Sequence, residues 1–235
     1  MKDLAYFEKE LNEINHILII SAGASFDLSL ESIQKFLKEK SCFVMIADSM
    51  AEAFFRLFKD YNYLSLTFSV ERKFHCFLKG IKSPIAFYAH GNLANLPRKN
   101  SDIYFFNYLH DKNQKFNLKL ISPGTVTGTM IAYALYLLQK YPYEVDSFGV
   151  DFAFPAGLYG SKYGAWFLES NSNRFFRKEG WHFEASLSRS YYFMPGFSVP
   201  VKTSEEFKRS KENIKKLFST VHFPLVWRQH GPFKL

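Results

Sequence analysis

Hydroxyl, carboxylate and guanidinium side chains follow the apolar runs of this sequence, each within a few positions of the end of a run. Hydroxyl and backbone N–H groups bind phosphate, and carboxylates hold metal ions or transfer protons. The residues concerned are Ser21, Ser25, Asp48, Ser49, Glu71, Arg72, Ser122, Thr125 and Asp151. The pattern predicts either an anion-binding site or a set of helix caps, because Ser, Thr, Asp and Gly also serve strand-to-helix turns.

Two segments that contain these residues combine small side chains with the start of a helical pattern. The first is Ser21-Ala-Gly23-Ala-Ser25, and the second is Ser122-Pro-Gly124-Thr-Val-Thr127-Gly-Thr. The N–H groups of a helix N-terminus bind anions, and small residues let a phosphate approach the backbone. We therefore expect nucleotide phosphates to bind at these turns.

The elements that must position these residues alternate along the chain. Short apolar runs that end near positions 20, 47, 70 and 150 have the length of buried strands, and helical patterns separate several of them. This order predicts a mostly parallel sheet with helices on both faces, in which every strand-to-helix turn lies at one edge. Ligands of such sheets bind outside the carboxyl ends of the strands. The predicted fold class is a Rossmann-like α/β domain.

The predicted nucleotide-binding core covers residues 1–155. Residues 155–203 show no clear period, and the basic tail that follows spaces its apolar residues helically. We expect 156–235 to form a C-terminal lid or small helical subdomain of the same domain.

The net charge, the N-terminal residues, the longest apolar stretch and the cysteines restrict the class of protein. The formal charge of +8 is spread along the chain, and its densest group fits a solvated helix face, so no nucleic-acid partner is expected. A charged N-terminus without a signal peptide, and a longest apolar stretch (125–138) too short to span a bilayer, predict a cytoplasmic protein without a membrane span. Cys42 and Cys76 are expected to be reduced and buried.

Several common nucleotide and hydrolase motifs are missing from the sequence. It contains no Gly-x-x-x-x-Gly-Lys-Ser/Thr, no Gly-x-Gly-x-x-Gly, no Asp-x-Asp and no Gly-x-Ser-x-Gly. The seven His residues are scattered without the spacing of metal ligands, so no metal site is predicted from the spacing. These observations argue against hydride transfer and hydrolase chemistry.

The order of the motifs resembles a known family. The resemblance rests on Ser21-Ala-Gly-Ala-Ser-Phe26, Ala47-Asp-Ser49, Val70-Glu-Arg72, Gly124-Thr-Val126 and Gly149-Val-Asp-Phe-Ala153, and covers about residues 15–165. The family is typified by the archaeal 6-hydroxymethyl-dihydropterin diphosphokinase and by the central domain of bacterial motility accessory factors. The latter are flagellin glycosyltransferases related to the bacterial sialyltransferases. This chain differs from the family pattern at Ser21, Ala24 and Tyr163, where the family has Gly, Pro and, in the glycosyltransferase branch, His.

The resemblance implies that the turn at Gly23–Ser25 and the segment Ser122–Thr127 hold nucleotide phosphates, and that Asp48, Ser49 and Asp151 line the pocket. A general base would come from elsewhere, and His182 is a candidate. The candidate catalytic residues are Asp151, Glu71 and His182. The candidate donor contacts are Tyr159, Tyr163 and Arg72, together with Arg174 and Arg189, which could hold a phosphate or a carboxylate.

Three functions fit this sequence. The first is a transferase that uses a nucleotide-activated sugar, such as a nonulosonic acid on CMP, requires no cofactor and modifies an acceptor such as flagellin. The second is a 6-hydroxymethyl-dihydropterin diphosphokinase, which requires Mg²⁺ held by Asp48, Glu71 and Asp151. The third is a non-catalytic nucleotide-binding or assembly protein. Metal dependence separates the first two, and binding without turnover identifies the third.

Overall fold

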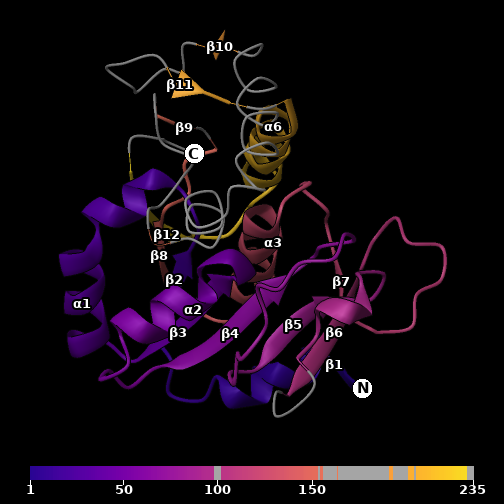
Figure 1. Cartoon of the computed structure of the whole chain (residues 1–235), viewed down its shortest axis with the longest axis horizontal. Helices are drawn as coiled ribbons and strands as arrows, with labels where there is room; N and C mark the ends of the chain where they lie inside the picture. The colour runs from indigo at the N-terminus through magenta and orange to yellow at the C-terminus, as the bar shows by residue number, and fades with distance from the viewer. Residues whose placement is uncertain are drawn as a thin grey trace.

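The chain is built around a nine-stranded sheet whose pairings are parallel throughout the described strands. The computed structural model describes residues 1–97, 102–152, 154–155, 163, 191–192, 201–203 and 205–231. The strands run in the order β1-β6-β5-β4-β3-β2-β8-β12, and β7 pairs with the same strand as β1 (Figure 1). Their bounds are β1 Lys2–Asp3, β2 His16–Ile20, β3 Cys42–Ala47, β4 Leu64–Ser69, β5 Ile85–Tyr88, β6 Ile103–Tyr108, β7 Lys119–Leu120, β8 Glu144–Phe148 and β12 Val226–His230.

Helices cover both faces of this sheet. One face packs on α1 (Leu30–Glu39) and α2 (Asp48–Leu57), and the other packs on α3 (Val126–Leu138) and α6 (Glu205–Ser219). Among the described residues, the 3₁₀ helices η1 (Leu4–Glu10), η2 (Ala24–Leu28) and η3 (Leu93–Asn95) lie in the connections between strands and helices. The expected Rossmann-like α/β fold, with a mostly parallel sheet and helices on both faces, is confirmed.

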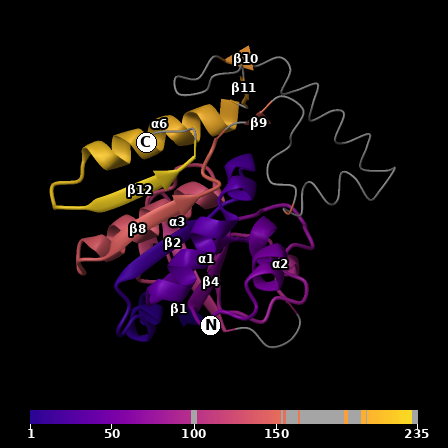
Figure 2. The same cartoon turned by 90° about the vertical axis from the view of Figure 1, so that its left-hand side faces the viewer.

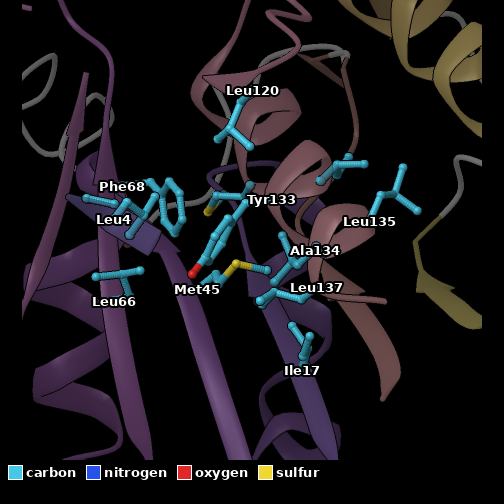
Figure 3. Packing of buried hydrophobic residues seen from close by; sticks show 14 of the residues in the cluster. Leu4, Ile17, Met45, Leu66, Phe68, Leu120, Tyr133, Ala134, Leu135 and Leu137 are labelled. Atoms are coloured by element: carbon cyan, nitrogen blue, oxygen red, sulfur yellow. The ribbon is translucent and has the colours of Figure 1, made fainter. Parts of the chain in front are cut away.

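The core on the α3 face explains why that helix is apolar on nearly all sides. The sheet covers one side of α3 and α6 packs on it from the other. Tyr133 points from α3 towards the sheet, where Figure 3 shows it among Met45, Leu66 and Phe68, and its ring centroid lies 5.6 Å from that of Phe68. Burial on two sides removes the polar face that a surface helix needs.

The C-terminal part of the chain contributes to the same sheet. Strand β12 pairs with β8 in parallel, and Figure 2 shows α6 running alongside β12. The rings of Phe218 on α6 and Trp227 on β12 lie 4.9 Å apart. A second, three-stranded antiparallel sheet joins β9 (Phe154–Pro155), β11 (Val201–Lys202) and β10 (Tyr191–Tyr192). Residues 205–230 therefore extend the central layers beyond position 155.

One prediction about the cysteines is wrong. Cys42 begins β3 and is buried, and this burial raises the pKa of its thiol to about 12. Cys76, by contrast, is exposed, because the segment after β4 forms a surface loop instead of an apolar run in the core. Within the described ranges, no helix combines the length and the apolar character needed to cross a bilayer.

Candidate functional site

The strand order reverses between β2 and β8. The strands β3 to β6 are added on one side of β2, whereas β8 and β12 lie on the other. At such a reversal the connections leave in opposite directions, which opens a crevice at the carboxyl ends of the two strands. The predicted Ser21, Gly23 and Ser25 follow β2, and Asp151 follows β8, so four predicted site residues meet at this point.

Ser25 and Asp151 join the two strand ends. The backbone N–H of Ser25 donates to Asp151 Oδ2 at 2.8 Å, and its hydroxyl donates a short hydrogen bond to Asp151 Oδ1. Burial raises the pKa of the Asp151 carboxyl, and the two bonds from Ser25 oppose that rise. The next residue, Phe152, has a φ of 49°, a left-handed conformation that is strained for an aromatic residue. Strain of this kind concentrates at functional sites.

Gly23 lies where the turn after β2 touches the turn after β8. Its N–H donates to the carbonyl of Gly149 at 2.8 Å, and a Cβ at position 23 would come within 2.6 Å of the Asp151 carboxyl carbon. The absence of a side chain is therefore required by the packing of the protein itself. This packing accounts for the glycine without the phosphate that the sequence suggested as its reason.

The N-terminus of α3 reaches the turn after β2. Thr127, in the first turn of α3, shares a 2.6 Å hydrogen bond with the Ser21 hydroxyl. Thr125 is the N-cap of α3: its hydroxyl accepts from the Gly128 N–H at 3.1 Å and also contacts Ser210 of α6 at 2.9 Å. Gly124 has a φ of 100° and open space around it, so it serves the turn that leads into the helix. Both readings of this segment, a cap and an anion site, fit its geometry.

A second group of predicted residues lies at the ends of β3 and β4. Asp48 begins α2 and accepts from the Ser49 N–H at 2.8 Å. Burial, together with the nearby charge of Glu71, raises the pKa of Asp48 to about 7, although hydrogen bonds from Ser69 and Ser49 oppose the shift. Asp48 and Glu71 thus form a pair of interacting carboxyl groups at the ends of β3 and β4.

Two predicted residues lie further along the edge. The Arg72 guanidinium donates to the Tyr88 hydroxyl at 3.2 Å, at the end of β5. Ser122 lies near the hydroxyl of Tyr108, the last residue of β6, and its interaction opposes the rise in the pKa of Tyr108 that burial causes. The predicted set therefore extends from β8 to β6 along the carboxyl edge instead of converging on one point.

The remaining predicted contacts divide into two groups. The ring of Tyr163 lies 6.3 Å from that of Phe26 in η2, edge to face, next to the turn after β2. Residues Tyr159, Arg174, His182 and Arg189 lie outside the described residues.

Strand β12 contributes residues that the sequence reasoning missed. Gly231 follows β12, and a Cβ there would lie 2.9 Å from Ser25 Oγ and 3.3 Å from Asp151 Oδ1. The Gln229 amide donates to the Val150 carbonyl at 2.8 Å, one residue before Asp151. The sequence signal was weak, because Val226–His230 carries polar and charged side chains where a buried strand would be apolar.

A buried acid holds β12 in place. Asp146 of β8 accepts from His16 Nε2 at 2.7 Å, from Arg228 Nε at 3.2 Å and from His230. Burial alone would raise the pKa of Asp146, but these three partners lower it to about 2. The network fixes the strand whose end reaches Ser25, and it also escaped the sequence reasoning.

The rest of the described residues add no candidate residues to the site at the carboxyl edge of the sheet. A hollow of about 400 Å³ lies at the opposite edge of the sheet, beside Leu37, Cys42 and Leu64, and holds none of the predicted site residues. No group of three or more His, Cys, Asp or Glu side chains in the described segments could hold a metal ion.

Comparisons of the chain with protein-family models, with curated proteins and with solved structures find no match.

Proposed function

We propose that this protein is a transferase that uses a nucleotide-activated donor, with the donor phosphate bound between the turn after β2 and the N-terminus of α3. The observation that carries the proposal is the hydrogen bond between Ser21 and Thr127, which brings these two elements together at the strand-order reversal. The N–H groups of the first turn of a helix lack intrahelical partners and attract anions.

The donor is a nucleotide-activated sugar, with a nonulosonic acid on CMP as the first choice. The order of the motifs supports this choice, since it resembles flagellin glycosyltransferases, and so does the position of Tyr163 beside the turn after β2. A protein acceptor such as flagellin and a cytoplasmic location belong to the same proposal.

A thermal-shift screen tests the proposal. The purified chain is heated with CMP, CDP, UDP, GDP, ATP or a pterin, each with Mg²⁺ or with EDTA. A ligand present at about 100 times its Kd and bound only to the folded state stabilises it by about 2.7 kcal/mol. We expect CMP or CDP to raise the melting temperature in EDTA, and CMP-sugars to be turned over.

A pair of threonine variants locates the binding site. Thr127→Val removes the hydroxyl that meets Ser21, and it should abolish most of the nucleotide shift. Thr220→Val is the control, because its hydroxyl donates to the Leu217 carbonyl at the exposed end of α6, away from the turn after β2. Equal shifts in the two variants, or no shift with any nucleotide, would contradict the proposed site.

The acid pair Asp48 and Glu71 supports a second candidate, the Mg²⁺-dependent 6-hydroxymethyl-dihydropterin diphosphokinase. Mg²⁺ is commonly held by one or two carboxylates together with substrate phosphates, and this pair fits that arrangement. Asp151 fits less well, because both of its oxygens already accept from Ser25. Stabilisation by ATP only with Mg²⁺ would favour this candidate, whereas binding of a nucleotide without turnover of any donor would favour a non-catalytic binding protein.

A further inference from the structure

A second polar cluster lies at the carboxyl ends of β5 and β6, centred on Asp111. The side chain of Asp111 is 7% exposed, and it accepts from the Tyr88 hydroxyl and from the Tyr108 N–H, both at 2.7 Å. These two bonds fix the carboxylate at the strand ends. A buried carboxylate held in this way is available to orient a neighbouring base.

Two histidines flank this carboxylate at nearly equal distances. His90 Nε2 lies 4.0 Å from Asp111 Oδ2, and His110 Nε2 lies 3.9 Å from Asp111 Oδ1. The His90 side chain is 37% exposed and follows β5, whereas the His110 side chain is 62% exposed and follows β6, one strand further from β2. Of the two, His90 is both more enclosed and closer to the donor site. Both separations are longer than a hydrogen bond, and catalytic contacts that are long in the free protein often tighten when substrate binds.

The first turns of α3 connect this cluster with the proposed donor site. Thr127 contacts Ser21, and Thr129, two residues later on the same helix, shares a 2.7 Å hydrogen bond with the Tyr108 hydroxyl. The ring centroids of Tyr108 and Tyr88 lie 4.5 Å apart, and Tyr88 holds Asp111. Because consecutive helical residues rise by about 1.5 Å, the Ser21 and Tyr108 contacts lie within a single turn of α3.

Exposed apolar side chains border the cluster. Phe74, Leu93 and Leu109 are each more than half exposed, and they lie in the loops after β4, β5 and β6. The first two loops are tied together, since the Asn95 side chain bonds the His75 N–H and the Lys73 carbonyl. Such a rim suits an acceptor with an apolar face.

We propose that His90, backed by Asp111, is the general base that receives the proton of the acceptor hydroxyl, and that the carboxyl ends of β5 and β6 form the acceptor side of the site. The acceptor carries a hydroxyl group next to an apolar face. This inference rests on the proposed transferase function.

The step balances as a simple substitution. The acceptor oxygen forms a bond with the anomeric carbon of the donor sugar while its proton passes to a nitrogen of His90. The bond between the anomeric carbon and the phosphate oxygen breaks, and its electron pair leaves with the nucleotide. The charge that develops on the imidazole is stabilised by Asp111.

A matched pair of histidine variants tests the role of His90. Nucleotide release is measured with CMP-N-acetylneuraminate as donor and water as acceptor, as a function of pH. General-base catalysis contributes about 10²- to 10⁴-fold, so His90→Gln should lower kcat at least about 100-fold, leave KM within about threefold and remove the acidic limb of the pH profile. His222→Gln, which changes an exposed histidine in the loop between α6 and β12, should stay within about threefold of the wild type in both parameters.

The readouts separate failure of this inference from failure of the proposed function. The thermal shift with CMP should be the same in His90→Gln as in the wild type, because His90 lies outside the donor site. Equal kcat values in the two histidine variants would overturn the role of His90 while leaving the transferase intact. A wild-type chain that binds CMP but releases none from the donor would also overturn it, and the nucleotide site would stand. Absence of both binding and release would remove the transferase function itself.

Discussion

Gly23 and Gly149 each occupy a position at which the other's turn leaves no room for a side chain. A Cβ on Gly23 would approach the Gly149 carbonyl, and a Cβ on Gly149 would approach the Ser21 carbonyl, both closer than 3.0 Å, which real Cβ atoms essentially never show. Gly149 also has a φ of 68°, so its own backbone favours glycine. This mutual contact holds the strand ends of β2 and β8 at the separation that lets Ser25 reach Asp151.

Replacement of Gly23 by alanine should destabilise the fold by about 2 kcal/mol or more, because the added methyl group meets backbone atoms that cannot move independently. Gly124→Ala is a suitable control, since a Cβ there meets nothing within 4 Å and only the positive φ is unfavourable, by roughly 1 kcal/mol. Urea unfolding of both variants measures the difference. A larger loss in Gly124→Ala would show that the two turns do not pack as described.

Ser25→Ala should cost about 1 to 3 kcal/mol, because it leaves the buried Asp151 carboxylate with one donor fewer. Ser219→Ala removes a hydroxyl whose bond to the Lys216 carbonyl is exposed, and such changes stay within about 0.5 kcal/mol. Chemical unfolding at neutral pH provides the comparison. Equal free energies of unfolding for the two variants would mean that the bond from Ser25 to Asp151 contributes no net stability.

Asp48 should make the protein less stable as the pH rises from about 4 to about 7. Its pKa in the folded state is about 7, above the ordinary value of 3.8 for an Asp carboxyl, so over this window the folded state holds a proton that the unfolded state has lost. The contribution is greatest below the unfolded pKa and falls by roughly 1 to 4 kcal/mol across the window. Unfolding free energies measured at several pH values should show this decline in the wild type and not in Asp48→Asn.

Glu71→Gln offers a second check of the same pair. The negative charge of Glu71 contributes to the high pKa of Asp48, so its removal should move the window of declining stability to lower pH. An unchanged window would show that burial alone, without Glu71, sets the pKa of Asp48.

Asp146 should act in the opposite direction. Its pKa of about 2 lies below the ordinary value of 3.8 for an Asp carboxyl, so it stabilises the fold above about pH 4. This contribution, about 2 kcal/mol, is lost as the pH falls towards 2. Acid unfolding followed by circular dichroism should show this loss in the wild type, whereas Asp146→Asn should already be destabilised at neutral pH. Asp102→Asn, which breaks an exposed pair with Lys2, should behave like the wild type.

The sequence was sufficient to predict the elements that bury apolar surface. The runs that became β2 and β3 are apolar at almost every position because both faces of the sheet are covered, and Thr125 could be identified near the start of α3 because a helix needs a cap there. Parallel strands place their ends at one edge, so the proximity of Ser25 and Asp151 also followed from the pattern.

What could not be predicted depends on pairing between distant segments. Strand β12 lies at the edge of the sheet, where its polar residues bond Asp146 and the Val150 carbonyl, so it lacks the apolar run of a central strand. The cluster around Asp111 escaped notice for a similar reason. Its members come from separate loops, and no spacing along the chain indicates that Tyr88 and His90 share one carboxylate.

The pairing of β2 with β8 also determines when the site can form during folding. Ser25 and Asp151 are 126 positions apart, and no shorter connection brings their strands together. The entropy of closing so long a loop must be overcome before the contact stabilises anything, and folds dominated by distant contacts form slowly. During synthesis, β2 to β6 can pair one after another as they emerge, whereas the contact between Ser25 and Asp151 cannot form until translation has passed residue 151. Until then the edge of β2 that later pairs with β8 is exposed. Exposed strand edges promote aggregation, which chaperones counteract.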